Sequence, residues 1–266
     1  MSYVFPAAQC DLDLNLGDKG LLNAITYVGM ISSAFFWGYL CDTLGRKKIL
    51  FIGYFLDALF VWVSSISQNF TVLMIMKYFG GFIINGPFAA LTCYLSEFHC
   101  AKYRARTQMV LGIIFSAGTI CLPLLAGIVL PSEINFYVFN YLRIHSWNVY
   151  LFILGIPTFI AGIVFMFLPE SPKFLMTSGQ NEKALEVLRL VYSINTGKSK
   201  DSYPIKMLVN ERKSNDIPIN GQTDEAPKKS ARQALAGGLE QLKPLFLPPF
   251  LQKMVLVCGL QMLIMM

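Results

Sequence analysis

Two ionisable side chains lie inside long apolar runs, where a charge is costly. Asp57 belongs to the run at residues 49–65 and Lys77 to the run at residues 70–93. An ionisable group in hydrocarbon normally faces a cavity or a partner, so both are candidates for contacting a charged solute or a coupling ion. Helical rise places them about 8 Å apart in depth, so a direct pair would need the lysine stem to reach toward Asp57. The alternatives to a functional role are such a structural pair and snorkelling of the lysine toward the membrane surface.

A third polar side chain, Asn85, lies in a segment of small residues. The surrounding sequence over residues 80–87, Gly-Gly-Phe-Ile-Ile-Asn-Gly-Pro, predicts a helix that kinks easily and that lets a neighbouring helix approach. Asn85 therefore either packs against another helix or lines a cavity. The candidates for a substrate cavity are Asp57, Lys77 and Asn85.

The densest charge in the chain lies in residues 38–48, Gly-Tyr-Leu-Cys-Asp-Thr-Leu-Gly-Arg-Lys-Lys, between two apolar runs. The connection is too short to be a domain, and Gly45 is expected to supply its turn. Gly38 lacks a side chain, so a neighbouring helix can approach it closely. Asp42 at a helix end can hold a cation or the positive N-terminus of an adjoining helix. Three cations close the stretch: Arg46, Lys47 and Lys48.

The composition indicates a membrane protein. Of 266 residues, 55% are hydrophobic and 14% are charged, and the mean hydropathy of +0.51 is too high for a soluble domain. The net charge of +6 implies no nucleic-acid partner, because the cations lie between apolar runs, where membrane orientation puts them. The six cysteines show no Cys-x-x-Cys spacing, so we expect no metal site. No nucleotide-binding loop or nucleophile pattern is found, so we expect no cofactor and no enzymatic activity.

Five apolar runs have the length of a membrane-spanning helix, about 20 residues. They are predicted at residues 21–39, 49–65, 70–93, 109–130 and 147–168. A sixth begins near Phe250 and is still apolar at Met266. The sequence therefore predicts an all-α membrane protein.

The cations in the short connections predict the orientation of these spans. The connections after the first and third runs carry most of them: Arg46, Lys47, Lys48, Lys102, Arg104 and Arg106. The opposite connections carry Arg143 alone. The positive-inside rule therefore puts residues 38–48 and the long polar stretch in the cytoplasm. The first run then begins outside, and we expect one helix upstream of this sequence.

Three parts are expected on this basis. Residues 1–168 form a transmembrane part without its first helix, residues 169–246 a cytoplasmic loop, and residues 247–266 the start of a further span. Within the loop, apolar residues at helical spacing over residues 180–192 predict an amphipathic helix: Ala184, Leu185, Leu188, Val191 and Tyr192. Beyond Asn195 the composition favours disorder, with a second short helix near residues 231–242.

Residues 38–47, with the pattern Gly-x-x-x-Asp-x-x-Gly-Arg-Lys, resemble a signature of the major facilitator superfamily. In that family the signature lies on the cytoplasmic side between the second and third helices of each six-helix half. A positive-inside loop would explain the cations but not the glycine and aspartate at those offsets. The arginine usual after the aspartate is Thr43 here, which removes one expected ion-pair partner. The resemblance implies a partial major facilitator fold, with the second to sixth helices plus the start of the seventh.

Two further motifs follow in family order. Residues 94–106 resemble the Glu and Arg pattern after the fourth helix of sugar and organic-ion carriers, and residues 168–175 resemble the Pro-Glu-Ser-Pro-Arg-Trp-Leu sequence after the sixth. By this resemblance, a group of residues is expected to form a cytoplasmic conformational gate: Gly38, Asp42, Gly45, Arg46, Lys47, Glu97, Arg104, Arg106 and Glu170. A static surface cluster is the alternative, because exposed ion pairs contribute only about 0 to 1 kcal/mol each.

The resemblance implies a transmembrane secondary transporter that moves small organic solutes by alternating access. Its partners would be a small-molecule solute, a coupling ion and the lipid bilayer. Residues 20–30 look most like the synaptic-vesicle-glycoprotein-like branch near the organic cation carriers, which implies a plasma or vesicle membrane. The alternatives are a non-transporting vesicle or receptor-like relative and a truncated half-transporter without function. Asp42→Asn is expected to impair the conformational cycle but not membrane insertion.

Overall fold

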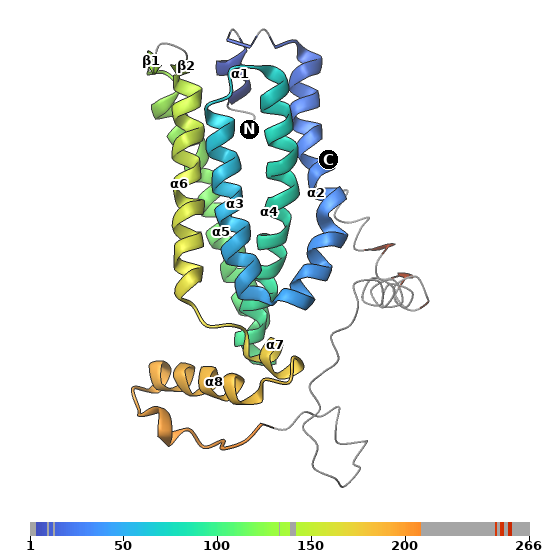
Figure 1. Cartoon of the computed structure of the whole chain (residues 1–266), viewed down its shortest axis with the longest axis vertical. Helices are drawn as coiled ribbons and strands as arrows, with labels where there is room; N and C mark the ends of the chain where they lie inside the picture. The colour runs from blue at the N-terminus through green and yellow to red at the C-terminus, as the bar shows by residue number, and fades with distance from the viewer. Residues whose placement is uncertain are drawn as a thin grey trace. The chain divides into compact units, whose positions relative to one another are not determined.

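The computed structural model describes residues 4–9, 11–12, 14–132, 134–138 and 142–208, together with 248, 251–252 and 255–256. In this part of the chain, five helices are long and apolar enough to cross a membrane. They are α2 (Leu16–Leu44), α3 (Arg46–Ser65), α4 (Phe70–Phe98), α5 (Ala101–Val129) and α6 (Ser146–Phe167). Figure 1 shows them bundled together along one long axis. The five predicted spans are confirmed.

Three of these helices are longer than the apolar runs that predicted them. α2, α4 and α5 have 29 residues each, which is about 44 Å of helix against a hydrocarbon core of about 30 Å. The additional turns are the polar flanks, so the cations Lys102 and Arg104 belong to the start of α5. The connections are correspondingly short, and a single residue, Gly45, separates α2 from α3.

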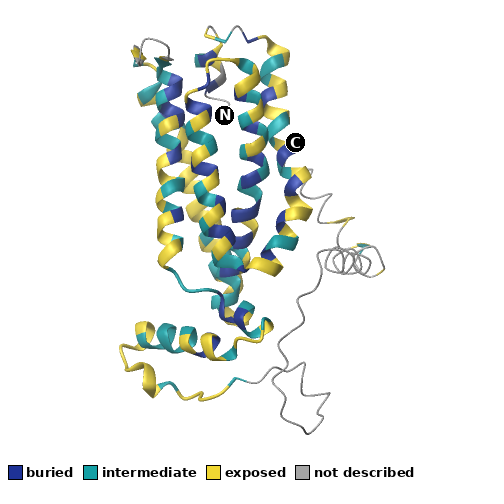
Figure 2. Cartoon of the chain, viewed as in Figure 1, coloured by how far each residue is buried: buried dark blue, intermediate teal, exposed yellow. Residues whose placement is uncertain are grey.

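α4 lies at the centre of the packing. It packs against both α2 and α3, and buried residues recur along its length (Figure 2). α5, which is described throughout, has Ala126 as its one buried residue. α4 also carries three of the candidate residues, Lys77, Asn85 and Glu97, so its contacts decide where most of the candidate site lies.

Glycines let α2 and α4 pack closely, although not at Gly38. A Cβ on Gly29 of α2 would overlap the Tyr78 carbonyl of α4, and one on Gly81 of α4 would overlap the Thr26 carbonyl of α2. A Cβ on Gly38 would meet none of the described atoms within 4 Å. Gly38 follows Gly29 by nine positions, which is about 180° around the helix, so it faces away from α4. The close approach expected at Gly38 is not formed in the described part of the chain.

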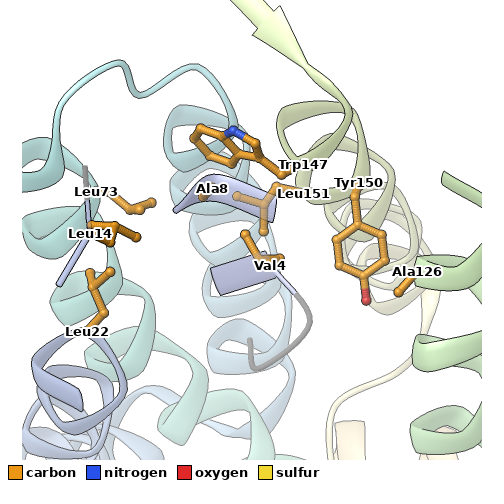
Figure 3. Close-up of a cluster of buried hydrophobic side chains, with 9 residues drawn as sticks. All are labelled: Val4, Ala8, Leu14, Leu22, Leu73, Ala126, Trp147, Tyr150 and Leu151. Atoms are coloured by element: carbon orange, nitrogen blue, oxygen red, sulfur yellow. The ribbon is translucent and has the colours of Figure 1, made fainter. Parts of the chain in front are cut away.

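The end of the bundle that is predicted to face outside contains a buried apolar cluster (Figure 3). Val4 and Ala8 of the short helix α1 (Val4–Ala8) belong to this cluster, as do Trp147 and Leu151 of α6. The indole Nε1 of Trp147 donates to Asp11 Oδ2 at 2.8 Å and ties the N-terminal segment to α6.

A short hairpin lies at the same end of the bundle. β1 (Asn135–Val138) and β2 (Leu142–His145) pair antiparallel, with Asn135 opposite His145. They lie in the connection before α6, for which the sequence predicted no regular structure. The membrane part is all-α as predicted, and this hairpin is an addition to it.

The opposite end carries two short helices below the bundle, α7 (Pro172–Thr177) and α8 (Asn181–Thr196) (Figure 1). α8 confirms the predicted amphipathic helix, because its Ala184 and Leu185 are buried. The 3₁₀ helix η1 (Lys200–Ser202) follows, and the Tyr192 ring lies 5.4 Å from that of Tyr203. The composition did not indicate the regular turn at η1, and the ring contact packs Tyr203, the residue after it, against α8.

Two segments expected from the sequence concern residues that the structure does not describe. The helix expected near residues 231–242 and most of the span expected from Phe250 lie outside the described residues. The division into residues 1–168, 169–246 and 247–266 stays a prediction.

Candidate functional site

Arg46 lies at the centre of a charge cluster at the predicted cytoplasmic end. It is the first residue of α3, and its Nη2 lies 3.2 Å from Glu97 Oε1 of α4 and 3.4 Å from Asp42 Oδ1 of α2. Its Nη1 donates to the Cys41 carbonyl at 3.1 Å. The guanidinium carbon lies 5.3 Å from the ring centroid of Phe174 in α7. This single side chain therefore joins four helices.

The two carboxylates that face Arg46 differ in burial. The Glu97 side chain is 7% exposed and the Asp42 side chain is 71% exposed. An exposed ion pair contributes about 0 to 1 kcal/mol, whereas removing one partner of a buried pair costs about 3 to 5 kcal/mol. Glu97 is therefore the main partner of Arg46, and Asp42 is the weaker one.

Glu170 caps the beginning of α3 from the connection between α6 and α7. Its Oε1 accepts hydrogen bonds from the backbone N–H groups of Arg46 at 3.1 Å, Lys47 at 3.0 Å and Ser171 at 2.9 Å. The first N–H groups of a helix have no partner within it and carry partial positive charge. A carboxylate at this position stabilises the helix start and binds the α6–α7 connection to it.

Gly45 makes this cap possible. Its φ of 95° lies in the region that favours glycine. A Cβ at this position would also overlap Glu170 Oε2 and lie 2.9 Å from Cε1 of Phe174. The predicted turn at Gly45 is confirmed, and the residue is required both for its backbone conformation and for the space that it leaves.

Two participating residues were not singled out from the sequence. The Ser171 hydroxyl donates to Glu97 Oε2 at 2.5 Å, and the Tyr94 hydroxyl donates to the Pro169 carbonyl at 2.7 Å. Both residues could have been found from the sequence. Tyr94 precedes Glu97 by three positions on one helix face, and Ser171 directly follows Glu170 in its motif. We call the four charged residues the cytoplasmic network: Asp42, Arg46, Glu97 and Glu170.

The remaining gate candidates lie apart from this network. Arg104 Nε donates to the carbonyls of Ser96 at 3.0 Å and His99 at 3.3 Å, at the C-terminal end of α4. That end is negatively polarised, which favours a cation. Arg106 lies 6.0 Å from the ring centroid of Tyr103. Among the described residues, neither arginine forms an ion pair.

Asp57 of α3 and Lys77 of α4 form a second group of charges, inside the membrane-spanning part. They are 6% and 7% exposed, and their opposite charges attract each other. In the described part of the chain, no ion pair within 4.0 Å joins them, and neither side chain makes a hydrogen bond. Both residues are therefore largely buried, and neither charged group is saturated by the described residues.

Asn85, the third cavity candidate, joins two helices. Its Nδ2 donates to the Met30 carbonyl of α2 at 3.1 Å and to Ser33 Oγ at 3.5 Å. Close by, Trp37 Nε1 donates to the Phe82 carbonyl at 2.6 Å. Of the two interpretations of Asn85, helix packing is the one that these contacts support.

Comparison with known proteins places these features in a family. The model of the Major Facilitator Superfamily matches residues 1–266. Among curated relatives, synaptic vesicle glycoprotein 2B of Rattus norvegicus is 31% identical over 196 residues, which cover 73% of this chain and 29% of the relative. Synaptic vesicle glycoprotein 2C of Mus musculus is 29% identical over 73% of this chain and 27% of its own length. The chain thus spans less than a third of these relatives.

Solved structures show the same fold. The proton:xylose symporter XylE bound to 6-bromo-6-deoxy-D-glucose matches with a TM-score of 0.59 at 16% identity, over 74% of this chain and 50% of that chain. A partially occluded inward open conformation of the xylose transporter XylE from E. coli gives 0.59 at 17% identity, over 74% and 55%. The predicted partial major facilitator fold is confirmed, and the protein is an integral, multi-pass membrane protein. The chain belongs to the major facilitator superfamily.

Proposed function

We propose that this chain supplies the amino-terminal half of a secondary transporter, which moves small organic solutes by alternating access. The observation that carries the proposal is the cytoplasmic network, in which Arg46 and Glu170 tie α2, α3 and α4 to the α6–α7 connection. Alternating access in such folds is rocking of one helix bundle against another. Rocking requires the helices of a half to move together, and buried polar contacts at their ends serve that purpose. The proposed chemistry makes and breaks no covalent bond.

Within the network, burial assigns different tasks to Glu97 and Asp42, the two carboxylates that face Arg46. Glu97 is buried against Arg46 and Ser171, so it keeps the helix ends together throughout the cycle. Asp42 is largely exposed and weakly held, so it is the member that can exchange partners when the halves rock. Lys47 contributes its backbone N–H to the Glu170 cap.

For the solute or coupling ion, we propose the pair of Asp57 and Lys77. Both are buried in the membrane and neither is saturated by the described protein groups, so a charged ligand would compensate them. Of these two residues, we propose Lys77 as the better candidate for the solute contact. Asn85 remains a weaker one, because its amide is engaged between α4 and α2.

Uptake by the full-length protein in proteoliposomes tests this proposal. Sugars, organic cations and organic anions would be offered with and without a proton or sodium gradient. We expect saturable uptake of at least one class above protein-free vesicles, abolished by Lys77→Met, and no uptake by purified residues 1–266 alone. Absence of uptake and binding for every class would overturn the proposal, and uptake by residues 1–266 alone would contradict the need for a second half.

A second function is favoured by one observation, the similarity to proteins named synaptic vesicle glycoproteins. A non-transporting vesicle protein of this fold would keep the cytoplasmic network for stability but would need no solute at Asp57 and Lys77. Solute-dependent thermal stabilisation of the full-length protein separates the two functions. A transporter is stabilised by its solute and loses this response in Lys77→Met, whereas a non-transporting relative responds to none of the offered solutes.

A further inference from the structure

An apolar groove of about 360 Å³ opens on the surface of the bundle, close to the cytoplasmic network. It lies between α2 and α3, and α4, which packs against both, contributes its inner wall. Large side chains line it and are between 36% and 47% exposed: Phe36, Leu44, Ile52, Leu56 and Phe79. The groove is therefore open at the surface of the described bundle, and none of the described side chains fills it.

The chemistry of the lining selects hydrocarbon. Every lining side chain is aliphatic or aromatic, and Trp37 is the one that carries a polar atom. Its Nε1–H is already used, because it donates to the Phe82 carbonyl at 2.6 Å. A polar solute would lose its hydration in this groove without gaining a hydrogen bond, which is costly. An acyl chain has no hydrogen bonds to water to lose, so it does not incur this cost.

A cation lies at the cytoplasmic mouth of the groove. Lys48 precedes Ile52 by four positions, so the two lie within about 40° on one face of α3. Lys47 precedes Ile52 by five positions and points about 140° away from it. Lys48 is exposed, and no ion pair within the described residues engages it. Its ammonium group can therefore reach the headgroup layer while its stem covers the groove.

The nearest carboxylate on α2 faces elsewhere. Asp42 precedes the lining residue Leu44 by two positions, which is about 200° around the helix, and it pairs with Arg46. The mouth of the groove is therefore positively charged. Anionic lipids are concentrated in the cytoplasmic leaflet, which is where the orientation of this chain places the mouth.

We propose that the groove between α2 and α3 binds an acyl chain of an anionic phospholipid from the cytoplasmic leaflet, with its phosphate held by Lys48. Charge complementarity at the mouth favours this occupant over a sterol or a neutral lipid, and the apolar lining beyond the mouth suits its acyl chain. The site is separate from Asp57 and Lys77 and does not depend on transport.

Photoactivatable lipids test the site in the full-length protein. Nanodiscs of phosphatidylcholine would contain trace phosphatidylserine or phosphatidylcholine with a diazirine in mid-chain, and labelled peptides would be mapped by mass spectrometry. We expect residues 36–44 and 49–56 to be labelled about fivefold more by phosphatidylserine, the preference that one lysine at an anionic surface provides. Residues 160–167 of α6, which also carry exposed apolar side chains, serve as the lipid-facing reference and should show no preference.

Variants separate the headgroup contact from the groove. Lys48→Gln should make labelling by the two lipids equal, whereas Lys102→Gln, a matched exposed lysine at the start of α5, should keep the preference. Ile52→Trp should lower labelling of the groove by both lipids and leave residues 160–167 unchanged. Because Lys48 is exposed, its variant is expected to fold, which size-exclusion chromatography checks.

Three results would overturn the proposal. The first is equal labelling of the groove by both lipids in the unchanged protein. The second is a phosphatidylserine preference that survives Lys48→Gln. The third is a groove that neither lipid labels in the full-length protein, as expected if a sterol or a further helix occupies it.

Discussion

The cytoplasmic network and the Asp57–Lys77 pair bury charges in the same helices in two different ways. In the network, both oxygens of Glu97 have partners, and Glu170 accepts three backbone N–H groups. In the pair, Asp57 and Lys77 are equally buried but attract each other without a contact in the described part of the chain. A saturated group holds structure, whereas an unsaturated one is available to a ligand.

This difference predicts how substitutions behave. A neutral substitution at Glu97, the buried carboxylate of the network, removes hydrogen bonds and should lower stability more than it changes function. A substitution in the pair removes an electrostatic attraction alone and should affect function more than stability. The predictions below test that distinction in the full-length protein, from the largest expected effect on stability to the smallest.

Glu97→Gln should have the largest effect. It leaves the Arg46 side chain, which is only 15% exposed, without its main counter-charge, and this is expected to lower the free energy of unfolding by about 3 to 5 kcal/mol. Chemical denaturation of the purified protein in detergent measures this loss. The double variant Arg46→Met with Glu97→Leu should recover most of it, because both charges are removed together. A loss below about 1 kcal/mol in Glu97→Gln would show that the pair is not buried in solution.

Gly45→Ala should destabilise the turn between α2 and α3. The positive φ alone is expected to cost about 1 to 3 kcal/mol, and the added Cβ displaces the Glu170 carboxylate. The melting temperature in detergent reports the effect. Gly20→Ala is the matched control, because a Cβ on Gly20 in α2 meets none of the described atoms within 4 Å. If the two alanine variants melted together, the cap at Gly45 would not contribute to stability.

The pair of Asp57 and Lys77 should show coupling. Each single variant, Asp57→Asn or Lys77→Met, leaves one buried charge uncompensated, and the double variant removes both. We expect a coupling free energy of about 0.5 to 3 kcal/mol in a double-mutant cycle. The double variant should be nearly as stable as the unchanged protein and fail to transport. Additive losses would mean that the two side chains do not interact, and transport by the double variant would remove them from the solute site.

Asp42→Asn should have the smallest effect on stability. Its side chain is 71% exposed, so the expected loss is below about 1 kcal/mol and shrinks further at high salt. Transport should slow, as expected for the member of the network that exchanges partners. A stability loss as large as that of Glu97→Gln, or transport at an unchanged rate, would contradict the division of tasks between the two carboxylates.

The membrane class, the five spans and the turn at Gly45 were readable from residue types alone. Transfer of apolar side chains from water to hydrocarbon is a local property, so a run of about 20 apolar residues predicts a helix without reference to the rest of the chain. The turn was equally local, because Gly45 lies in a short connection between two apolar runs, and glycine readily adopts the backbone conformations of tight turns. Motif resemblance also brought Arg46, Glu97 and Glu170 together in one expected group.

Which of these charged residues pair with one another depended on how the helices approach one another. Only the packing of α4 beside α3 makes Glu97 a buried partner of Arg46 while Asp42 remains exposed. The cap by Glu170 joins residues more than 120 positions apart, and Asn85 finds its partner on α2. Burial and distance arise from these long-range approaches, which hydropathy and spacing do not encode. For the same physical reason, Gly38 turned out to face away from α4, and the groove beside Lys48 became visible only in three dimensions.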